Sequence, residues 1–399
     1  MLCTLALTLA LNLGRAPRVQ ATEPASAHVV SDPQAELLQL AFDSVSAMPE
    51  VPHLRNRNRA QESIVQACLE LDLPDRAQRY ALAITDWRKA QALADIALHQ
   101  ARKERTEAAR ATLILAEQAV RDLQATQEWQ AERVMAHLAA ACYWLGDTEA
   151  VAKLTARVGE AEIQTVQVVV ASRSTPEQFD QRMELLSTAV KSGSFDAMAA
   201  SLQTAAELHR TLYSDAPRRE RAEALIKSSW EKLPLDVRAG LLRRLADNAL
   251  AAGDAAGATR QLDEAQALVD NNRWLSEDHI AQIAQIARLR AAAGERERAQ
   301  RDLAGVLGLY ERERDKITDI YRADALRPVA EALVALGDRQ AALATFARAV
   351  DEGLANPNSR PRADDLAEIA CSIARSKLVP DAELTARLRK AQAGLGDPW

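Results

Sequence analysis

Apolar residues recur at helical spacing on both sides of a glycine near the C-terminal end of this chain. The first stripe consists of Leu326, Val329, Ala330 and Leu333, and the second consists of Ala342, Phe346, Ala349 and Val350. Gly337-Asp338 lies between them, and glycine tolerates the left-handed backbone that often ends a helix. The pattern predicts a hairpin of two amphipathic helices, which cannot bury its apolar faces alone.

Other segments repeat this pattern. A large residue, a second large residue three positions later and then an alanine or its equivalent recur from Leu93, Met135, Leu242 and Ile283. Seven residues after that alanine stand Glu104, Gly146, Gly253, Gly294 and Gly337. Five residues further stand Ala109, Ala258, Ala299 and Ala342, with the copy at Gly146 displaced by one position. The chain is therefore predicted to be an array of at least five helical hairpins.

The small residue, the glycine turn and the following Ala, Leu-or-Phe and Ala positions resemble the tetratricopeptide repeat (TPR), from Arg59 to Ala393. The resemblance implies an all-α, right-handed α-α superhelix, a solenoid whose first helices line a concave groove. Aliphatic residues replace most of the aromatic residues of the family's first helix. The repeat period is also long, because Ala258, Ala299 and Ala342 are 41 and 43 residues apart, whereas the usual TPR period is about 34 residues. A period near 40 residues fits HEAT-type arrays as well.

Segments at the ends and in the middle are less regular. A short helix is expected over Pro33–Met48. A polar break before the array is expected at Asn56–Asn58. In the middle, a helix is expected over Glu162–Ser172 and another from Pro176 to Val190. Met198, Leu202 and Ala205 then fit the second half of a hairpin, and Arg218–Lys232 an extra helix. Asp381–Ala393 is expected to form a final helix that caps the array, followed by a tail at Asp397–Trp399.

The N-terminus predicts export. Residues 1–13 are an apolar run too short to span a bilayer, and small residues follow, with a possible signal-peptidase site at Val19-Gln20-Ala21. No lysine or arginine precedes the run, so an uncleaved membrane anchor and a cytoplasmic protein with a misassigned start stay as alternatives. We expect a signal peptide at 1–21, a linker with a short helix at 22–54 and the repeat array at 55–395. The mature protein is expected to be periplasmic, with no stable membrane span.

Composition narrows the classes of function. Apolar residues make up 48% of the chain and aromatic residues only 4%, which suits closely packed helices, since alanine is the best helix former. The richness in arginine and alanine is typical of a GC-rich bacterial genome. A net charge of −6 with mixed charges along the helices argues against a nucleic-acid partner.

No motif predicts catalysis, a metal site or a cofactor. The chain has no phosphate-binding glycine loop, no Cys-x-x-Cys and no pair of histidines at metal-binding spacing. Cys68, Cys142 and Cys371 stand beside alanines in first helices and are expected to be buried free thiols. The acid pairs Glu277-Asp278 and Asp364-Asp365 are both expected at the beginnings of helices, where acids favour the helix dipole.

The resemblance places candidate binding residues at the positions of the first helices that packing leaves free. These residues are Arg133, Tyr143, Arg243, Asp247, Arg288, Asp324, Arg327 and Glu331. Their arginines suit an extended polar or acidic segment. We therefore expect a non-catalytic scaffold that binds a protein or peptide, or assists envelope assembly. The alternatives are the superhelical part of a cell-wall enzyme, which two converging carboxylates with shifted pKa values in a cleft would support, and an intracellular TPR regulator.

Overall fold

The computed structural model describes residues 32–121, 127–159, 162–192, 195–229 and 232–399. Over these residues it contains 19 α-helices, one short 3-10 helix and no strand. The first ten helices are α1 (Pro33–Ser46), α2 (Glu50–Glu70), α3 (Pro74–Ala83), α4 (Arg88–Arg102), α5 (Thr106–Arg121), α6 (Glu128–Leu145), α7 (Thr148–Thr155), α8 (Ile163–Ala171), α9 (Pro176–Ser192) and α10 (Phe195–Thr211). The others are α11 (Ala216–Ser228), α12 (Leu235–Ala251), α13 (Ala255–Asp270), α14 (Ser276–Ala292), α15 (Arg296–Glu313), α16 (Asp319–Ala335), α17 (Arg339–Leu354), α18 (Ser359–Arg375) and α19 (Ala382–Ala393). The predicted all-α fold is confirmed.

The hairpin that the sequence defined most clearly is α16 and α17, and its turn shows how these hairpins are made. Gly337 has a φ of +79°, and its N–H donates to the carbonyl of Val334 at 2.8 Å. The carboxylate of Asp338 then accepts the N–H of Ala341 at 3.0 Å and caps α17. Glycine thus ends one helix and the following aspartate begins the next. Gly146-Asp147 and Gly253-Asp254 repeat the arrangement.

Left-handed turns appear at every position that the repeat pattern predicted. The glycines with positive φ are Gly146, Gly253, Gly294 and Gly337. Glu104 has a φ of +60°, which confirms the turn expected there without glycine. Asp72 and Lys377 also have positive φ, at 55° and 52°. They extend the series to the hairpin of α2 and α3 and to the end of α18.

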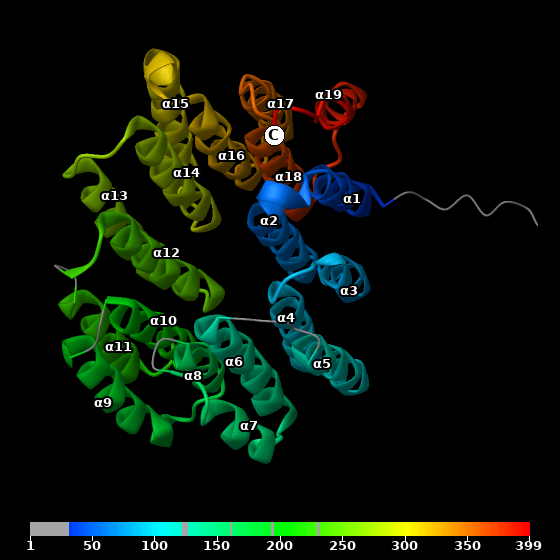
Figure 1. The fold of residues 1–399 in the computed structure, drawn as a ribbon. Helices are drawn as coiled ribbons and strands as arrows, with labels where there is room; N and C mark the ends of the chain where they lie inside the picture. Colours follow the sequence, from blue (N-terminus) through cyan, green and yellow to red (C-terminus); the bar gives the residue numbers. More distant parts are fainter. Residues whose placement is uncertain (1–31, 122–126, 160–161, 193–194, 230–231) are drawn as a thin grey trace, which may run out of the picture. The chain divides into compact units, whose positions relative to one another are not determined.

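The even-numbered helices form a continuous series of neighbours (Figure 1). Each one from α2 to α16 packs against the next even-numbered helix, and α18 packs against both α16 and α2. Neighbour contacts among these nine helices of the described chain therefore close into a cycle. Most odd-numbered helices pack on the preceding even-numbered helix, as α5 does on α4 and α17 on α16. The core runs between the two sets.

The two ends of the described chain build the last hairpin together. Helix α18 packs more extensively with α1 than with any other helix, about as extensively as α16 packs with α17. Helix α1 also contacts α2. In α1, Leu38, Ala41 and Val45 are fully buried. The amide of Gln392 donates to the carbonyl of Leu40 at 3.4 Å. Helix α1 therefore takes the place of a second helix for α18, and α19 covers α17 and α18 beside it.

The C-terminal tail packs on the beginning of α18. The N–H of Ser359 donates to the carbonyl of Pro398 at 2.8 Å, and its hydroxyl donates to the carbonyl of Gly396. Ser359 is fully buried. The tail thus satisfies polar groups at a helix N-terminus that lacks a side-chain cap.

The middle of the chain contains the expected helices, and one of them, α10, has more neighbours than the sequence predicted. Helices α8, α9 and α19 form where helices were expected. Helix α10, which carries Met198, Leu202 and Ala205, packs between α8 and α12 in the even-numbered series. It also packs on the preceding α9, as the predicted hairpin requires, and on α11 to a similar extent. Helix α11 forms in the region where an extra helix was expected. The pattern Leu202-x-x-Ala205-Ala206 follows the first-helix pattern except that alanine replaces its second large residue.

Near the N-terminus, the predicted polar break at Asn56–Asn58 is wrong, because these residues lie inside α2. Asn58 is fully buried and its amide donates to the hydroxyl of Thr85 at 3.2 Å. Residue 55, where we expected the array to begin, also lies in α2. The predicted signal peptide lies outside the described residues. Within them, no helix is both long and apolar enough to span a membrane.

Candidate functional site

Polar side chains four residues apart occupy one face of four even-numbered helices. Residues at this spacing are neighbours on a helix surface. The pairs are Glu62 and Gln66 of α2, Gln91 and Asp95 of α4, Arg133 and His137 of α6, and Asp364 and Glu368 of α18. In α4, α6 and α18 they stand six and two residues before the alanine that precedes the left-handed turn by seven residues. In α2 they stand at the same distances before Cys68. Because α18 packs against α2, the four helices are consecutive neighbours in the cycle.

These pairs are linked between neighbouring helices in α2, α4 and α6. The amide of Gln91 donates to Glu62 at 2.8 Å, and that of Gln66 donates to Asp95 at 3.0 Å. Asp95 also meets Nδ1 of His137 at 2.5 Å. Burial raises the pKa of Glu62 to about 7. Burial lowers the pKa of His137, but the carboxylate of Asp95 outweighs it, so the net shift is upward.

All eight predicted binding residues lie on even-numbered helices. Arg133 and Tyr143 are in α6, Arg243 and Asp247 in α12, Arg288 in α14, and Asp324, Arg327 and Glu331 in α16. The structure thus brings the last three together and spreads the others over three helices. Their role in partner binding stays a prediction.

Several of these arginines already have partners within the chain. Arg133 forms an ion pair with Glu162 at 3.0 Å. The guanidinium of Arg243 donates to the side chain of Gln282 in α14, and burial, with Arg288 nearby, lowers its pKa to about 10. Arg288 and Asp247, in contrast, are exposed. Of the predicted residues on α12 and α14, these two are therefore open to a partner, and Arg243 is half-buried.

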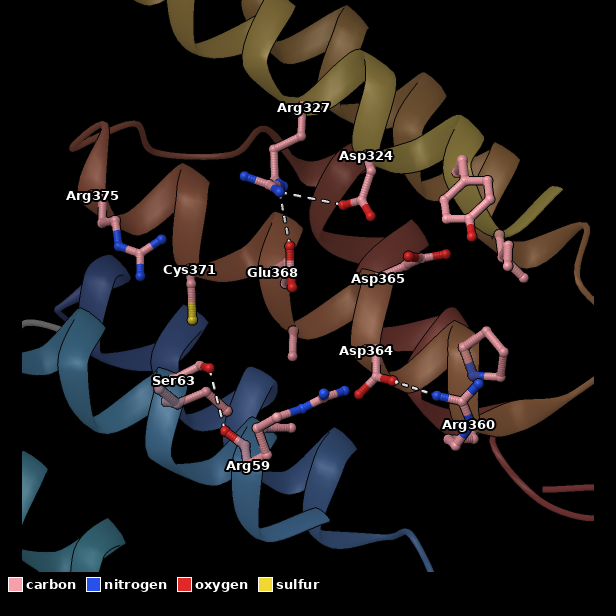
Figure 2. A pocket seen from close by; sticks show the side chains of 16 residues that line it. Arg59, Ser63, Asp324, Arg327, Arg360, Asp364, Asp365, Glu368, Cys371 and Arg375 are labelled. Atoms are coloured by element: carbon pink, nitrogen blue, oxygen red, sulfur yellow. Dashed lines mark hydrogen bonds and ion pairs between the residues drawn. The ribbon is translucent and has the colours of Figure 1, made fainter. Parts of the chain in front are cut away.

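A cavity of 620 Å³ lies where the cycle of even-numbered helices closes, between α2, α16 and α18 (Figure 2). We call it the seam pocket. Its charged lining comprises Arg59, Asp324, Arg327, Arg360, Asp364, Asp365, Glu368 and Arg375. Ile320, Tyr321 and Pro361 add apolar surface. Only the packing of α18 against α2 brings residues from both ends of the chain into one site.

Arg327 is the central cation of the seam pocket. Its guanidinium lies 2.8 Å from Glu368, 3.2 Å from Asp324 and 3.6 Å from Glu331. Glu331 also accepts the hydroxyl of Ser372 at 2.7 Å. One guanidinium therefore balances three carboxylates, two of which line the cavity.

The other arginines of the seam pocket lie at its edges. Arg360 pairs with Asp364 at 3.2 Å, and Arg375 pairs with Glu70 of α2 at 2.6 Å across the contact between α18 and α2. Arg59 is exposed in α2, and its carbonyl accepts the hydroxyl of Ser63. Figure 2 shows the side chain of Arg59 extending between α2 and α18.

Asp365 differs from its neighbours because none of the described cations is paired with it. It is 8% exposed, and its Oδ2 atom has no hydrogen-bond partner among the described residues. A Cβ atom added to Gly353 of α17 would come within 2.9 Å of this oxygen, so the glycine provides the space for the carboxyl group. Burial, with Asp324, Glu368 and Asp364 nearby, raises the pKa of Asp365 to about 8.

Two more carboxyl groups of the seam pocket have raised pKa values. Burial raises the pKa of Asp364 to about 6, although Arg360 opposes the shift. Burial also raises the pKa of Glu368, against the effect of Arg327. Near neutral pH Asp365 therefore holds a proton, which a bound cation would displace.

The expectation for Asp364-Asp365 is wrong, because α18 begins at Ser359 and has no acid in its first turn. The pair lies in the second turn, where the dipole argument does not apply. The signal available in the sequence was the position of Asp364, six residues before Ala370 on the face where the other helices carry polar pairs. Glu277-Asp278, in contrast, lies in the first turn of α14 as predicted.

The three thiols are buried and free, as predicted. Burial raises the pKa of Cys68 and of Cys371 to about 12 and that of Cys142 to about 11. Thiols with such pKa values are poor nucleophiles. Across the described ranges, no cluster of three or more His, Cys, Asp or Glu residues is arranged to hold a metal ion.

Comparisons with known proteins add little to this description. No protein-family model matches the chain, and no curated protein matches it either. One solved structure that aligns with it is titled "Circular tandem repeat protein with novel repeat topology and enhanced subunit contact surfaces". The two are 16% identical over 91% of this chain and 94% of the other, with a TM-score of 0.17. At that score the alignment carries no argument, and the helical repeat fold rests on the helices and contacts described above. TPR membership and the handedness of the array stay predictions.

Proposed function

We propose that this protein is a non-catalytic scaffold that binds a protein partner along the exposed side of its even-numbered helices. The observation that carries the proposal is the recurrence of polar residues on the same face of successive helices. Packing requires the small and apolar residues of these helices, whereas it does not require Arg288 or Asp247, which are exposed on α14 and α12. Repeated exposed charges on one face are typical of repeat proteins that bind extended segments.

Reversing both exposed charges tests the proposal without disturbing the core. The double variant Asp247→Lys, Arg288→Glu leaves the net charge unchanged, and we expect it to lose partner capture from envelope extracts. Arg243 and Arg327 are unsuitable for this test because both are bound within the chain. Capture by the double variant at the level of the unmodified protein would reject the proposed surface.

A matched control places the same changes on an odd-numbered helix. Arg110 and Glu117 are exposed on α5, so Arg110→Glu, Glu117→Lys also keeps the net charge. We expect this control to retain capture. Equal loss in both double variants would indicate nonspecific electrostatics.

Export to the periplasm is part of the same proposal and rests on the apolar segment at 1–13. N-terminal sequencing of the protein from fractionated cells tests it, with a mature terminus near residue 22 as the expected result. An intact Met1 in the cytoplasmic fraction would favour the intracellular alternative.

The seam pocket favours a second candidate function, a hydrolase or part of one. Asp364, Asp365 and Glu368 lie in one cavity with raised pKa values, as acid-base catalysis requires. Two of the three are held by arginines, however, which favours binding over chemistry. Release of soluble fragments from purified cell-wall polymer, abolished in Asp364→Asn, would establish the enzyme hypothesis, and no release at any pH from 5 to 9 would reject it.

A further inference from the structure

The seam pocket has an excess of carboxyl groups over available cations. Arg360 is matched by Asp364, and Arg375 by Glu70. Asp324 and Glu368 share Arg327 with a third carboxylate. Arg59, the fourth arginine of the lining, acts on Asp364. Among the described residues, Asp365 is therefore left with no cation of its own.

Asp365 is also the observation that points to a ligand. A carboxyl group that is 92% buried loses its hydration, and leaving it without a hydrogen-bond partner costs free energy. Its Oδ2 atom packs against Gly353, while the residue lines a cavity large enough for a ligand group. A cavity of 620 Å³ is within the roughly 300–1,000 Å³ typical of small-ligand sites.

The remaining lining indicates the shape of the ligand. Tyr321 is 46% exposed although it is a large aromatic residue, and Pro361 lies in the same wall. An aliphatic stem packs on such surfaces, and an aromatic face also attracts a cation. The exposed guanidinium of Arg59, on the opposite side in α2, suits a carbonyl oxygen.

We propose that the seam pocket binds the guanidinium or ammonium group of a basic side chain from the polypeptide partner. The cation lies among Asp364, Asp365 and Glu368, its stem lies against Tyr321, and Arg59 donates to a main-chain carbonyl beside it. This rests on the proposed function and changes its expected chemistry. The sequence favoured an acidic segment bound by arginines, whereas the buried oxygen without a partner in this pocket belongs to a carboxyl group.

Binding is expected to depend on pH. A bound cation stabilises the charged form of Asp365, so it displaces a proton from that group below pH 8. The charged groups that face Asp365 are Asp324 and Arg327 from α16 and Asp364 and Glu368 from α18. Asp324 forms an ion pair with Arg327. Asp364 and Glu368 have raised pKa values themselves. Affinity is therefore expected to rise from pH 6 to pH 8.5, with proton release on binding.

The test uses the full chain and two blocked five-residue peptides, one with a central arginine and one with neutral citrulline in its place. Titration calorimetry at pH 8 is expected to show at least tenfold tighter binding of the arginine peptide. Asp365→Asn keeps the size of the side chain and is expected to weaken arginine-peptide binding at least tenfold and to reduce its pH dependence. Asp247→Asn, on α12 outside the pocket, is the matched control and is expected to bind as the unmodified protein does.

Two further measurements protect the test. Tyr321→Ala changes an exposed side chain, so this variant can still be measured if Asp365→Asn does not fold. We expect Tyr321→Ala to weaken arginine-peptide binding several-fold. Arg59→Met is expected to weaken binding of the arginine peptide but not binding of agmatine, which has the same guanidinium and no main-chain carbonyl. If Arg59→Met leaves both ligands unaffected, the pocket is a site for free amines and the polypeptide assignment is overturned.

Equal binding of the two peptides, or an unchanged affinity in folded Asp365→Asn and Tyr321→Ala, overturns the proposal altogether. Such a result leaves partner capture through Asp247 and Arg288 intact as a separate measurement. Failure of the pocket and failure of the scaffold function are therefore distinguishable.

Discussion

Two arginines of this protein, Arg290 and Arg327, are each surrounded by three carboxylates, yet their surroundings differ. Arg290 of α14 is fully buried, and its partners are Asp263, Glu295 and Asp302 from the helices and turn around it. Arg327 of α16 is 24% exposed and faces the seam pocket. The guanidinium of Arg290 has no exposed surface, although its partner Asp302 lines a separate cavity. Arg327, in contrast, itself lines a cavity.

This difference teaches how to separate structural charges from functional ones. A guanidinium that is fully buried among its own ion-pair partners has a packing role, because no ligand can reach it. Beside Arg327, in contrast, the buried Oδ2 atom of Asp365 has no hydrogen-bond partner among the described residues, and the residue lines the cavity. The same residue types therefore support different interpretations, and the space beside them decides between the two.

The largest effect is expected for Arg290→Met. Removing this guanidinium leaves three carboxylates without their common cation, and breaking a buried ion pair costs about 3–5 kcal/mol. Urea denaturation of Arg290→Met and Arg327→Met measures the difference. We expect a smaller loss of unfolding free energy for Arg327→Met, since water reaches that cluster. An equal loss would contradict the distinction drawn above.

A second test asks whether the hairpin built from both chain ends is as well packed as a hairpin within the array. Leu38 of α1 and Leu262 of α13 are both fully buried. Each leucine-to-alanine change is expected to cost about 2–5 kcal/mol, from lost burial and the cavity that remains. A cost below about 1 kcal/mol for Leu38→Ala alone would show that α1 is loosely attached.

A third test concerns the pH dependence of stability. The pKa of Asp365 is raised from 3.8 to about 8, so the folded protein holds a proton there that the unfolded chain releases. Its contribution to stability is complete below pH 4 and is lost as the pH rises to 8, by at most about 1.4 kcal/mol per pH unit. In Asp365→Asn this slope should decrease, as measured by unfolding at several pH values. An unchanged slope would show that Asp365 is charged in the folded protein.

The smallest effects are expected at the turns. Gly337 has a φ of +79°, so Gly337→Ala should cost about 1 kcal/mol through backbone strain although nothing lies within 4 Å of the added carbon except Arg296. Glu104 adopts the same region without being glycine. Glu104→Gly should therefore stabilise by up to about 1 kcal/mol, measured by thermal unfolding. A gain of stability in Gly337→Ala, or a loss in Glu104→Gly, would contradict this explanation of the two turns.

Much of the fold could be predicted from local pattern. The stripes at Leu326 and Ala342, the glycine turns and even the left-handed Glu104 follow from spacing alone, because each hairpin is a local unit. The place of α10 in the even-numbered series was not predicted, because a helix that begins one hairpin can also pack on the helix before it. Only its neighbours, α8 and α12, show that it belongs to the even-numbered series.

The sequence by itself determined most of the helices and their turns, since these depend on contacts within about 40 residues. Only the tertiary structure decided that α1 completes the hairpin of α18 and that Arg59 meets Asp365 and Glu368 in one cavity. Those residues are some 300 positions apart, and no local periodicity encodes a contact of that length. Burial, which the sequence does not show, raises the pKa values of Asp364 and Asp365.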